Sequence, residues 1–314
     1  MRNERMLVTG GAGFIGSHII EAALAQGWSV AALDDLSGGH RENVPAGVPL
    51  YEVDIRSGES VRAAVADFQP TVISHQAAQA SVSVSVREPV FDAEVNIIGG
   101  LNVLGAALES DVQRIVFAST GGAIYGEVPQ GTADEHTAEW PYSPYATSKL
   151  AFEKYLETFQ QQYGLDSVVL RYANVYGPRQ NPHGEAGVVA IFAERLLSGQ
   201  PLQINARSEL GDGGCLRDYV YVGDVARANI AAASGDFPRR LNVGTATETS
   251  TQDLGDQLAQ ALGVEATLTF ASARAGDLQR SVLDDALFRQ VLGAPLSLAE
   301  GLKRTAQWIR SQSL

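Results

Sequence analysis

The stretch TGGAGFIG, residues 9–16, joins two segments with different hydrophobic patterns. Before it, MLVTG at residues 6–10 is a short apolar run typical of a buried strand. After it, residues 11–27 carry apolar side chains at helical spacing and end at a glycine. Three glycines recur at every third position, namely Gly10, Gly13 and Gly16. Such glycines allow a tight turn, close approach of a pyrophosphate to the backbone, and close packing of helix on strand. The stretch therefore predicts a dinucleotide-binding unit rather than a loop that only turns the chain.

Two neighbouring features indicate which dinucleotide binds. The start of the predicted helix offers the backbone N–H groups around Phe14 and Ile15 to phosphate oxygens. The segment WSVAALDD, residues 28–35, reads as a second strand that carries Asp34 at its end. A carboxylate there accepts hydrogen bonds from both ribose hydroxyls and repels a 2′-phosphate, so we expect NAD rather than NADP.

The following residues continue to alternate between strand and helix patterns. Buried strands are predicted at residues 48–54, 70–75, 113–119 and 167–172, and helices near 57–68, 88–109 and 145–163. This alternation predicts an α/β fold with a doubly wound parallel sheet of the Rossmann type. Beyond residue 172 the pattern loosens into a loop at 174–187, a helix at 188–199 and a polar loop at 206–218. We therefore expect an NAD-binding domain at 1–171, with a returning segment near 219–245, and a smaller α/β domain at 172–314.

The composition limits the partners and the surroundings of the protein. A formal net charge of −13 argues against nucleic acid or an anionic membrane as a partner, and requires local arginines for any anionic ligand. The single cysteine, Cys215, indicates a reducing, cytoplasmic location. We identify no signal region and no apolar run near membrane-spanning length. No metal is expected, because helical metal spacing is missing among the histidines His18, His40, His75, His136 and His183.

The stretch SPYATSK, residues 143–149, places Tyr145 and Lys149 four residues apart at the start of a predicted helix. Residues at this spacing share one helix face. A neighbouring ammonium, together with the positive nicotinamide ring of NAD, would favour the phenolate form of the tyrosine. That phenolate could accept a proton from a substrate hydroxyl while hydride leaves the same carbon. The alternative is an amphipathic helix on which the tyrosine packs and the lysine is solvated.

Seven blocks in this order carry a resemblance that spans residues 9–278, nearly the whole chain. The blocks are TGGAGFIGSH, HQAAQASV, ASTGGAIYGE, SPYATSK, RYANVYGPRQ, RDYVYVGDVA and RAGDL. Together they resemble the extended short-chain dehydrogenase/reductase family and, within it, the UDP-sugar 4-epimerases. The resemblance implies an NAD-dependent isomerase that inverts carbon 4 of a UDP-hexose through a 4-keto intermediate. UDP-glucose and UDP-galactose are the expected substrates, in galactose metabolism, and the N-acetylated forms and UDP-glucuronate are further candidates.

The resemblance also implies roles for individual residues. Tyr145 would be the catalytic base, and Lys149 would tune it and hold the ribose. Gly121 stands where family members usually place a catalytic hydroxyl, so we nominate Thr120 for that role, with Ser119 as the alternative. The other implied cofactor ligands are Asp54, Ile55, Ala77, Ala78, Gln79, Asn96, Ser119 and Tyr172. The implied substrate ligands, beside Thr120 and Tyr145, are Asn174, Val188, Val189, Phe192, Arg217, Arg274, Asp277 and Ser281. Asn96 could equally serve helix–strand hydrogen bonding, and Asp218 is expected to orient Arg217 or the fold.

Other activities on the same fold fit the sequence less well. A sugar dehydratase needs an acid just after the Ser/Thr position, and a decarboxylating relative needs a glutamate there, but residues 121–124 are GGAI. A reductase–epimerase that consumes NADPH does not suit Asp34. A non-catalytic NAD-binding protein would need neither the Tyr/Lys pair nor the two arginines.

Two further expectations concern substrate size and assembly. Ser281 stands where a bulky tyrosine in family members excludes N-acetyl groups, so acetylated sugars are expected to fit unless a nearby loop fills the space. The resemblance also implies a homodimer built from the helix near 90–109 and the one that starts at Tyr145. Five apolar side chains on them could serve that interface or the sheet packing, namely Leu101, Leu104, Leu108, Leu156 and Phe159.

Overall fold

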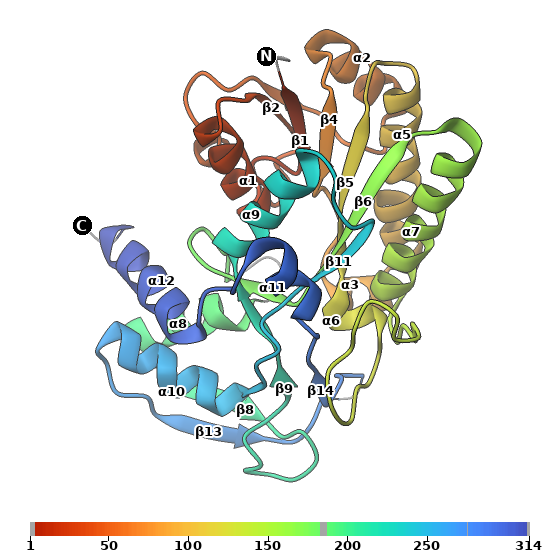
Figure 1. Cartoon of the computed structure of the whole chain (residues 1–314). Coiled ribbons are helices and arrows are strands. Elements are labelled where there is room, and N and C mark those ends of the chain that lie inside the picture. Colours follow the sequence, from red (N-terminus) through yellow and green to blue (C-terminus); the bar gives the residue numbers. More distant parts are fainter. Residues whose placement is uncertain (1–3, 183–186, 275, 313–314) are drawn as a thin grey trace. The chain divides into compact units, whose positions relative to one another are not determined.

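The computed structural model describes residues 4–182, 187–274 and 276–312. A seven-stranded sheet with the order β11-β6-β5-β4-β1-β2-β3 is its main feature (Figure 1). The strands are β1 (Arg5–Thr9), β2 (Ser29–Asp34), β3 (Leu50–Glu52), β4 (Val72–His75), β5 (Arg114–Thr120), β6 (Asp166–Tyr172) and β11 (Arg240–Val243). The β1–β2, β1–β4, β2–β3 and β4–β5 pairs are parallel. The order reverses beside β1, which confirms the predicted doubly wound fold.

Helices flank this sheet because alternate side chains of each strand point to opposite faces. They are α1 (Phe14–Ala25), α2 (Gly58–Phe68), α3 (Val82–Arg87), α4 (Pro89–Ala93), α5 (Gly100–Leu108), α7 (Pro144–Tyr163) and α9 (Val222–Ala233), with a π-helical turn, η2 (Glu94–Gly99), between α4 and α5 and a 3₁₀ turn, η1 (Arg41–Asn43). Leu33, Ile73 and Phe117 pack in one buried cluster with residues of α2, α5 and α7. Ser74, the neighbour of Ile73, instead donates a hydrogen bond to Asn229 of α9.

The chain divides into two compact units. Unit 1 comprises Met1–Thr120, Ser143–Arg171 and Val225–Leu241, and unit 2 comprises Gly121–Tyr142, Tyr172–Asp224 and Asn242–Leu314. Residues 121–142 thus group with unit 2, although the sequence assigned them to the first domain. The reason is long-range pairing within unit 2: Tyr125 donates to Asn242 at 2.8 Å, and Ala133 forms a β-bridge with Leu283.

Unit 2 is built from three small sheets and several helices. Its strands are β7 (Asn174–Tyr176), β8 (Leu202–Asn205), β9 (Leu216–Arg217), β10 (Tyr219–Tyr221), β12 (Thr249–Ser250), β13 (Leu268–Ala271) and β14 (Arg280–Ser281). Its helices are α6 (Gly121–Ile124), α8 (Val188–Leu197), α10 (Thr251–Leu262), α11 (Ala286–Leu292) and α12 (Leu298–Gln312). Side chains of α8, α10 and α12 bury a common core around Phe192, Leu258 and Leu302. The short strands β7 and β9 lie within segments predicted as loops, and residues 183–186 of the first loop, including His183, lie outside the described residues.

The stretch Pro89–Leu108 corrects one expectation from the sequence. By length and composition alone it is long and apolar enough to cross a membrane, whereas no such apolar run was expected. A mostly buried core helix of a soluble protein has the same length and composition. Here Val103 and Leu104 are buried against the sheet, which accounts for much of the apolar character.

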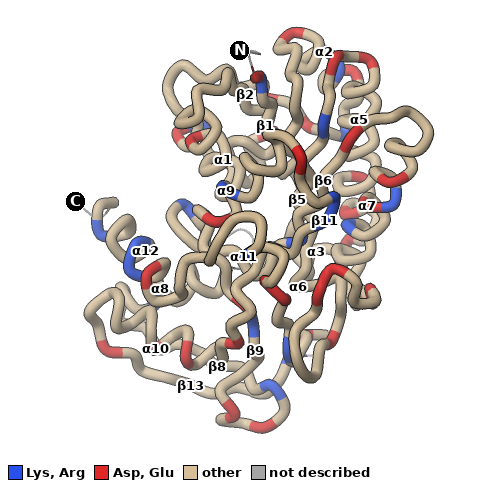
Figure 2. Tube along the Cα trace, viewed as in Figure 1, with Lys and Arg blue, Asp and Glu red and all other residues tan. Residues whose placement is uncertain are grey.

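The positions of charged residues are distributed along both units (Figure 2). The chain has 36 acidic and 23 basic residues, which keeps the surface acidic. Among the described residues, no group of three His, Cys, Asp or Glu side chains is arranged to hold a metal ion.

Candidate functional site

The glycine-rich loop between β1 and α1 is shaped by close backbone contacts. Gly10 has a φ of +67°, which favours glycine, and a Cβ there would lie 2.7 Å from the Ala77 amide nitrogen. A Cβ at Gly16 would overlap the Gly10 carbonyl oxygen. Gly11, which the three-residue spacing did not single out, is also required, because its Cβ would lie 2.7 Å from that of Ala32. Gly13 caps α1 without a side-chain hydrogen bond or an acidic residue in the first turn, so the helix start suits an anion.

Asp34 lies at the end of β2 and holds this loop in place. Its Oδ2 accepts a hydrogen bond from the Ala12 N–H at 2.9 Å, and its Oδ1 accepts one from the Leu36 N–H at 2.8 Å. Burial raises the pKa of this carboxyl, and the backbone N–H groups of Leu36, Ala12 and Gly13 oppose that effect. Because a carboxylate has about four acceptor sites, these backbone bonds leave capacity for a ribose hydroxyl. The residue therefore fits the predicted role at the cofactor.

The loop after β4 is held by Asn96 from the π-helical turn. Asn96 Oδ1 accepts from the Gln79 N–H at 2.9 Å, while its Nδ2 donates to the Gln79 carbonyl at 2.9 Å and to Ser148 Oγ at 3.2 Å. At the other end of the loop, the Ala77 N–H donates to Thr9 Oγ1 at 3.2 Å. Asn96 thus supports the segment that contains Ala77, Ala78 and Gln79, in line with a structural asparagine near the cofactor.

Asp54 and Ile55, the predicted adenine neighbours, lie in different surroundings. The Arg56 guanidinium donates to Asp54 Oδ2 at 2.9 Å through Nε and holds the pKa of that carboxyl below its usual value. Ile55 is buried in the core of unit 1, and a Cβ at Gly99 would lie 2.7 Å from it. The contact of these two residues with adenine stays a prediction.

Tyr145 and Lys149 share one face of α7. Ser143 caps this helix by accepting the Ala146 N–H at 3.2 Å, and Pro144 occupies its first turn. Lys149 is only 3% exposed, and its Nζ donates to the Ala118 carbonyl of β5 at 3.0 Å. The same Nζ lies 6.0 Å from the centroid of the Tyr145 ring. The alternative in which the lysine is solvated is therefore wrong.

The two neighbouring hydroxyls of β5 differ in their contacts. Ser119 is buried and donates to Glu153 Oε1 at 2.5 Å. Thr120, the last residue of β5, is half-buried, and its hydroxyl makes no hydrogen bond with another residue in the described part of the chain. The helix α6 begins at Gly121, and neither Gly121 nor Gly122 has a positive φ. The two glycines therefore form a regular helical turn and not a bulge that could move a neighbouring hydroxyl into the place of residue 121. This geometry favours Thr120 over Ser119 as the free hydroxyl.

The predicted substrate ligands lie in unit 2, and several contact its backbone. Asn174 Nδ2 donates to the Asp218 carbonyl at 3.0 Å, and Arg217 donates to the Leu278 carbonyl at 2.5 Å. The Arg274 guanidinium contacts Asn205. When the Asn205 amide is oriented to satisfy both groups, its oxygen accepts a hydrogen bond from Arg274 Nε at 2.9 Å. Sequence reasoning missed Asn205, and its place at the end of β8 was the only available signal.

The remaining predicted ligands of this group differ in exposure. Asp277 is exposed, whereas Ser281 is 2% exposed and donates to the Gly122 carbonyl at 3.1 Å. Val189 and Phe192 are buried in the core of unit 2 and Val188 lies at its edge, so their contact with substrate stays a prediction.

Asp218 and Tyr172 occupy buried positions. Asp218 accepts from the Thr245 N–H at 3.0 Å and from the Thr245 hydroxyl at 2.6 Å, and burial raises its pKa to about 6. These contacts show that the Asp218 side chain orders the fold, which was one of the two expected roles. Tyr172 is 5% exposed at the end of β6, and its role near the nicotinamide stays a prediction.

The glycine loop, the acid at the end of β2 and the buried lysine on α7 define an NAD-binding protein of the short-chain dehydrogenase/reductase type. Residues 6–244 match the NAD dependent epimerase/dehydratase family, and the chain belongs to that family. The resemblance carried by the seven sequence blocks is thereby confirmed.

Three similar proteins are named UDP-glucose 4-epimerases. The relative from Mycolicibacterium smegmatis is 44% identical, with 98% of this chain and 99% of the relative covered. The crystal structure of the Thermus thermophilus enzyme in complex with NAD is 54% identical with a TM-score of 0.94, covering 98% of this chain and 99% of that one. The Thermotoga maritima enzyme with UDP-glucose is 44% identical with a TM-score of 0.93, covering 99% of this chain and 100% of that one.

Proposed function

We propose that this chain is an NAD-dependent isomerase that inverts carbon 4 of a UDP-hexose, with UDP-glucose and UDP-galactose as its substrates. The observation that carries the proposal is the buried Lys149 ammonium, 6.0 Å from the Tyr145 ring on the same helix face. The names of the similar proteins support the same reaction.

The residues of unit 1 fit NAD on structural grounds. The contacts at Gly10 and Gly16 leave no room for a Cβ, and the N-cap residue Gly13 has no side chain to cap the start of α1. Asp34 retains acceptor capacity for a ribose hydroxyl and would repel a 2′-phosphate. Bound NAD would supply the acceptor for the hydride from carbon 4 and the source of its return.

The proposed acid–base chemistry belongs to α7 and the end of β5. The Lys149 ammonium favours the phenolate of Tyr145, because opposite charges in a partly buried site interact strongly. Tyr145 would then accept the proton of the sugar 4-hydroxyl and return it after the 4-keto sugar has turned over. Thr120 would hold the same substrate oxygen by a hydrogen bond, since its hydroxyl is not engaged by another described residue.

Unit 2 would hold the nucleotide part of the substrate. Guanidinium groups match phosphate oxygens in geometry and charge, so Arg217 and Arg274 would bind the diphosphate, with Asn174 and Asp277 as further ligands. Because the chain is acidic as a whole, such local positive charge is needed to bind an anionic substrate.

The small side chain at position 281 extends the proposal to N-acetylated UDP-sugars. Ser281 is turned toward the Gly122 carbonyl and fills little volume. We expect Ser281→Tyr to lower turnover of UDP-N-acetylglucosamine much more than turnover of UDP-glucose. Equal turnover of the acetylated sugar by wild type and variant would contradict this expectation.

Other activities receive less support from the chain. A dehydratase would need an acid after Thr120, where GGAI forms α6. A UDP-glucuronate 4-epimerase shares the same acid–base groups, so a panel of UDP-sugars is the discriminating assay. A non-catalytic NAD-binding protein has no use for a buried lysine beside Tyr145.

The decisive experiment is incubation of the purified chain with UDP-galactose without added NAD. UDP-glucose should form, because the cofactor is regenerated in each cycle and can stay bound. Tyr145→Phe should abolish conversion, by at least about 100-fold, since a general base contributes 10²–10⁴-fold. Conversion by Tyr145→Phe at the wild-type rate would exclude the proposed base.

The proposal also covers the setting of the enzyme. A cytoplasmic location agrees with the single cysteine, and the homodimer and the place in galactose metabolism are proposed from the family resemblance. The interface we expect differs in detail from the sequence-based one. Leu104 and Leu156 are buried in the core of unit 1, whereas Val86, Val90 and Ile98 are exposed on α3, α4 and the π-helical turn.

A further inference from the structure

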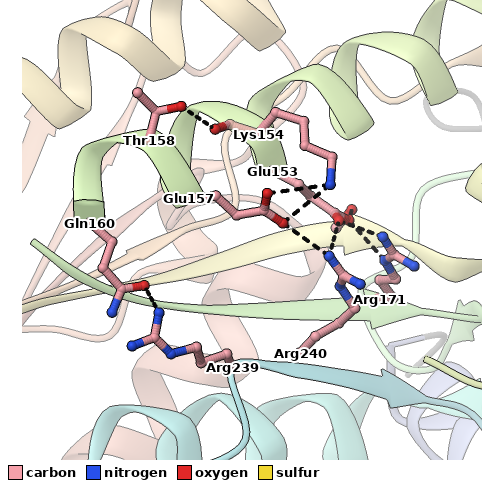
Figure 3. A network of polar contacts seen from close by, with 9 residues as sticks. Glu153, Lys154, Glu157, Thr158, Gln160, Arg171, Arg239 and Arg240 are labelled. Carbon is pink, nitrogen blue, oxygen red and sulfur yellow. Dashed lines mark hydrogen bonds and ion pairs between the residues drawn. The ribbon is translucent and has the colours of Figure 1, made fainter. Parts of the chain in front are cut away.

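The helix that carries the proposed acid–base pair also takes part in a network of polar and charged side chains in unit 1 (Figure 3). Its centre is Glu153 of α7, which has no exposed surface. Arg171 of β6, equally buried, donates to Glu153 through Nη2 at 2.6 Å and through Nε at 3.0 Å. Arg240 of β11 lies 3.7 Å from the same carboxylate and 3.2 Å from Glu157, which is on the next turn of α7.

The network is joined to the end of β5 by Ser119. The Ser119 hydroxyl donates to Glu153 Oε1 at 2.5 Å, which is in the short range of charge-assisted hydrogen bonds. One turn earlier on α7, Lys149 donates to the carbonyl of Ala118 at 3.0 Å. Two successive residues of β5 are thus bonded to two successive turns of the helix that carries Tyr145.

Stability alone does not account for such a network. Replacing a buried ion pair by apolar side chains of similar volume is often neutral or stabilising, whereas removing one partner is costly. In some proteins, buried ionic groups of this kind select one arrangement of the packed elements. The position of α7 relative to the end of β5 is the geometry that the proposed reaction depends on.

We infer that Glu153 is a positioning residue for the epimerisation. It accepts the hydrogen bond of the Ser119 hydroxyl and fixes α7 against β5, so that the Thr120 hydroxyl is left to bind the substrate. Glu153 itself touches neither substrate nor cofactor and acts through Ser119 and the helix. The inference rests on the proposed function, because it concerns the rate of that reaction.

The test is a double-mutant cycle of Ser119→Ala and Glu153→Gln, with kcat and KM measured for UDP-galactose. If the two residues act through their hydrogen bond, their effects are not additive. We expect kcat to fall ~5-fold in Ser119→Ala, ~30-fold in Glu153→Gln and ~30-fold in the double variant, since a small misplacement of reacting groups can cost up to 10²-fold. KM should stay within ~3-fold of wild type, because the substrate contacts of unit 2 are unchanged.

Glu157→Gln is the matched control, because Glu157 bonds Arg240 from the same helix but its side chain is 47% exposed. It should keep wild-type kcat.

Additive effects on kcat in the double variant would overturn the inference, and so would a folded Glu153→Gln with wild-type kcat. If Glu153→Gln does not fold, Ser119→Ala decides alone: an unchanged kcat, or a loss as large as that of Thr120→Ala, contradicts the assignment of the two hydroxyls. Wild type that converts no UDP-galactose would instead refute the proposed function.

Discussion

At the scale of single residues, the glycines show how backbone contacts determine function. Gly16 and Gly105 both lie in helices, α1 and α5, but only Gly16 faces a carbonyl oxygen that a Cβ would overlap. At Gly105 a Cβ would meet nothing within 4 Å. The same substitution should therefore have opposite effects at the two positions.

We expect Gly16→Ala to lower the free energy of unfolding by about 1–3 kcal/mol, because the loop must shift to accept the methyl group. The affinity for NAD should fall with it. Gly105→Ala, the matched control, should raise the free energy of unfolding by about 0.5–1 kcal/mol, since alanine favours a helix interior. Urea denaturation and NAD titration measure both. Equal behaviour of the two variants would contradict the role given to Gly16.

His75 predicts how stability depends on pH. Its ring is 1% exposed, its Nδ1 is 2.7 Å from Thr9 Oγ1, and burial, with a smaller effect of Lys149, lowers its pKa from 6.5 to about 3. Between pH 6.5 and about pH 3, His75 is therefore protonated in the unfolded chain and neutral in the folded chain. The stabilisation from a neutral His75 is present above pH 6.5 and is lost as the pH falls toward 3.

The comparison is between wild type and His75→Asn. The free energy of unfolding of wild type should fall more steeply between pH 6.5 and 4, with an extra slope of up to ~1.4 kcal/mol per pH unit. Asp218, whose pKa burial raises to about 6, contributes with the opposite sign in both proteins and cancels. Denaturation curves at several pH values give the slopes. Identical slopes would mean that His75 can be protonated in the folded state.

At the scale of elements, the first turn of α7 joins stability to catalysis. Ser143 accepts the Ala146 N–H at 3.2 Å, and Tyr145 follows within the same turn. Ser250 caps α10 of unit 2 in the same manner, accepting the Asp253 N–H at 3.0 Å. The two helix caps therefore form a matched pair, of which only one is next to a proposed catalytic residue.

Ser143→Ala and Ser250→Ala should each lower the free energy of unfolding by about 1 kcal/mol, as expected for a lost N-cap. Only Ser143→Ala should also lower kcat, because fraying of the first turn displaces Tyr145. Thermal unfolding and kcat on UDP-galactose separate the two effects. A fall in kcat of the same size in Ser250→Ala would show that the loss reflects stability rather than the position of Tyr145.

The elements also show which features can be predicted from sequence. The strands and helices of the Rossmann-type sheet follow from continuous apolar runs and helical spacing, and their ranges agree with the prediction to within a few residues. The strands β7 and β9 were missed, because they are three and two residues long and lie among glycine and polar residues. Such short strands exist through pairing with distant segments, β10 and β12, which periodicity does not register.

At the scale of the whole molecule, three exposed apolar side chains on unit 1 predict self-association. Val86, Val90 and Ile98 have exposed fractions of 63%, 70% and 51% on consecutive parts of the α3 to η2 segment. A second copy of the chain would remove these side chains from water. Among the five positions nominated from sequence, only Leu108 is comparably exposed, at 39%.

We expect wild type to sediment as a dimer and Val90→Glu to dissociate at least ~10-fold more readily, because a charge would be buried in the interface. Leu210→Glu is the control, since Leu210 is 70% exposed but belongs to unit 2, whereas Val90 belongs to unit 1. Sedimentation velocity over a range of concentrations measures the change. Wild type that remains a monomer at every concentration would exclude the proposed dimer.

The sequence by itself determined the Rossmann-type sheet, the NAD-binding unit and the Tyr145–Lys149 pair. These features depend on local patterns: glycine spacing, a strand that ends in an acid, and two residues one helical turn apart. Neighbours along the chain fix such geometry without help from distant segments.

The tertiary structure alone decided which hydroxyl at the end of β5 is engaged. Ser119 and Thr120 are adjacent in sequence, but Ser119 meets a glutamate 34 residues away that is buried with Arg171. The hydrogen bond from Arg274 to Asn205 could not be predicted from the sequence either, because Asn205 ends β8 and Arg274 lies far from it along the chain. Contacts of this kind depend on how elements pack. Burial makes the contacts among Ser119, Glu153 and Arg171 selective, because an unpaired charge in the interior is too costly to persist.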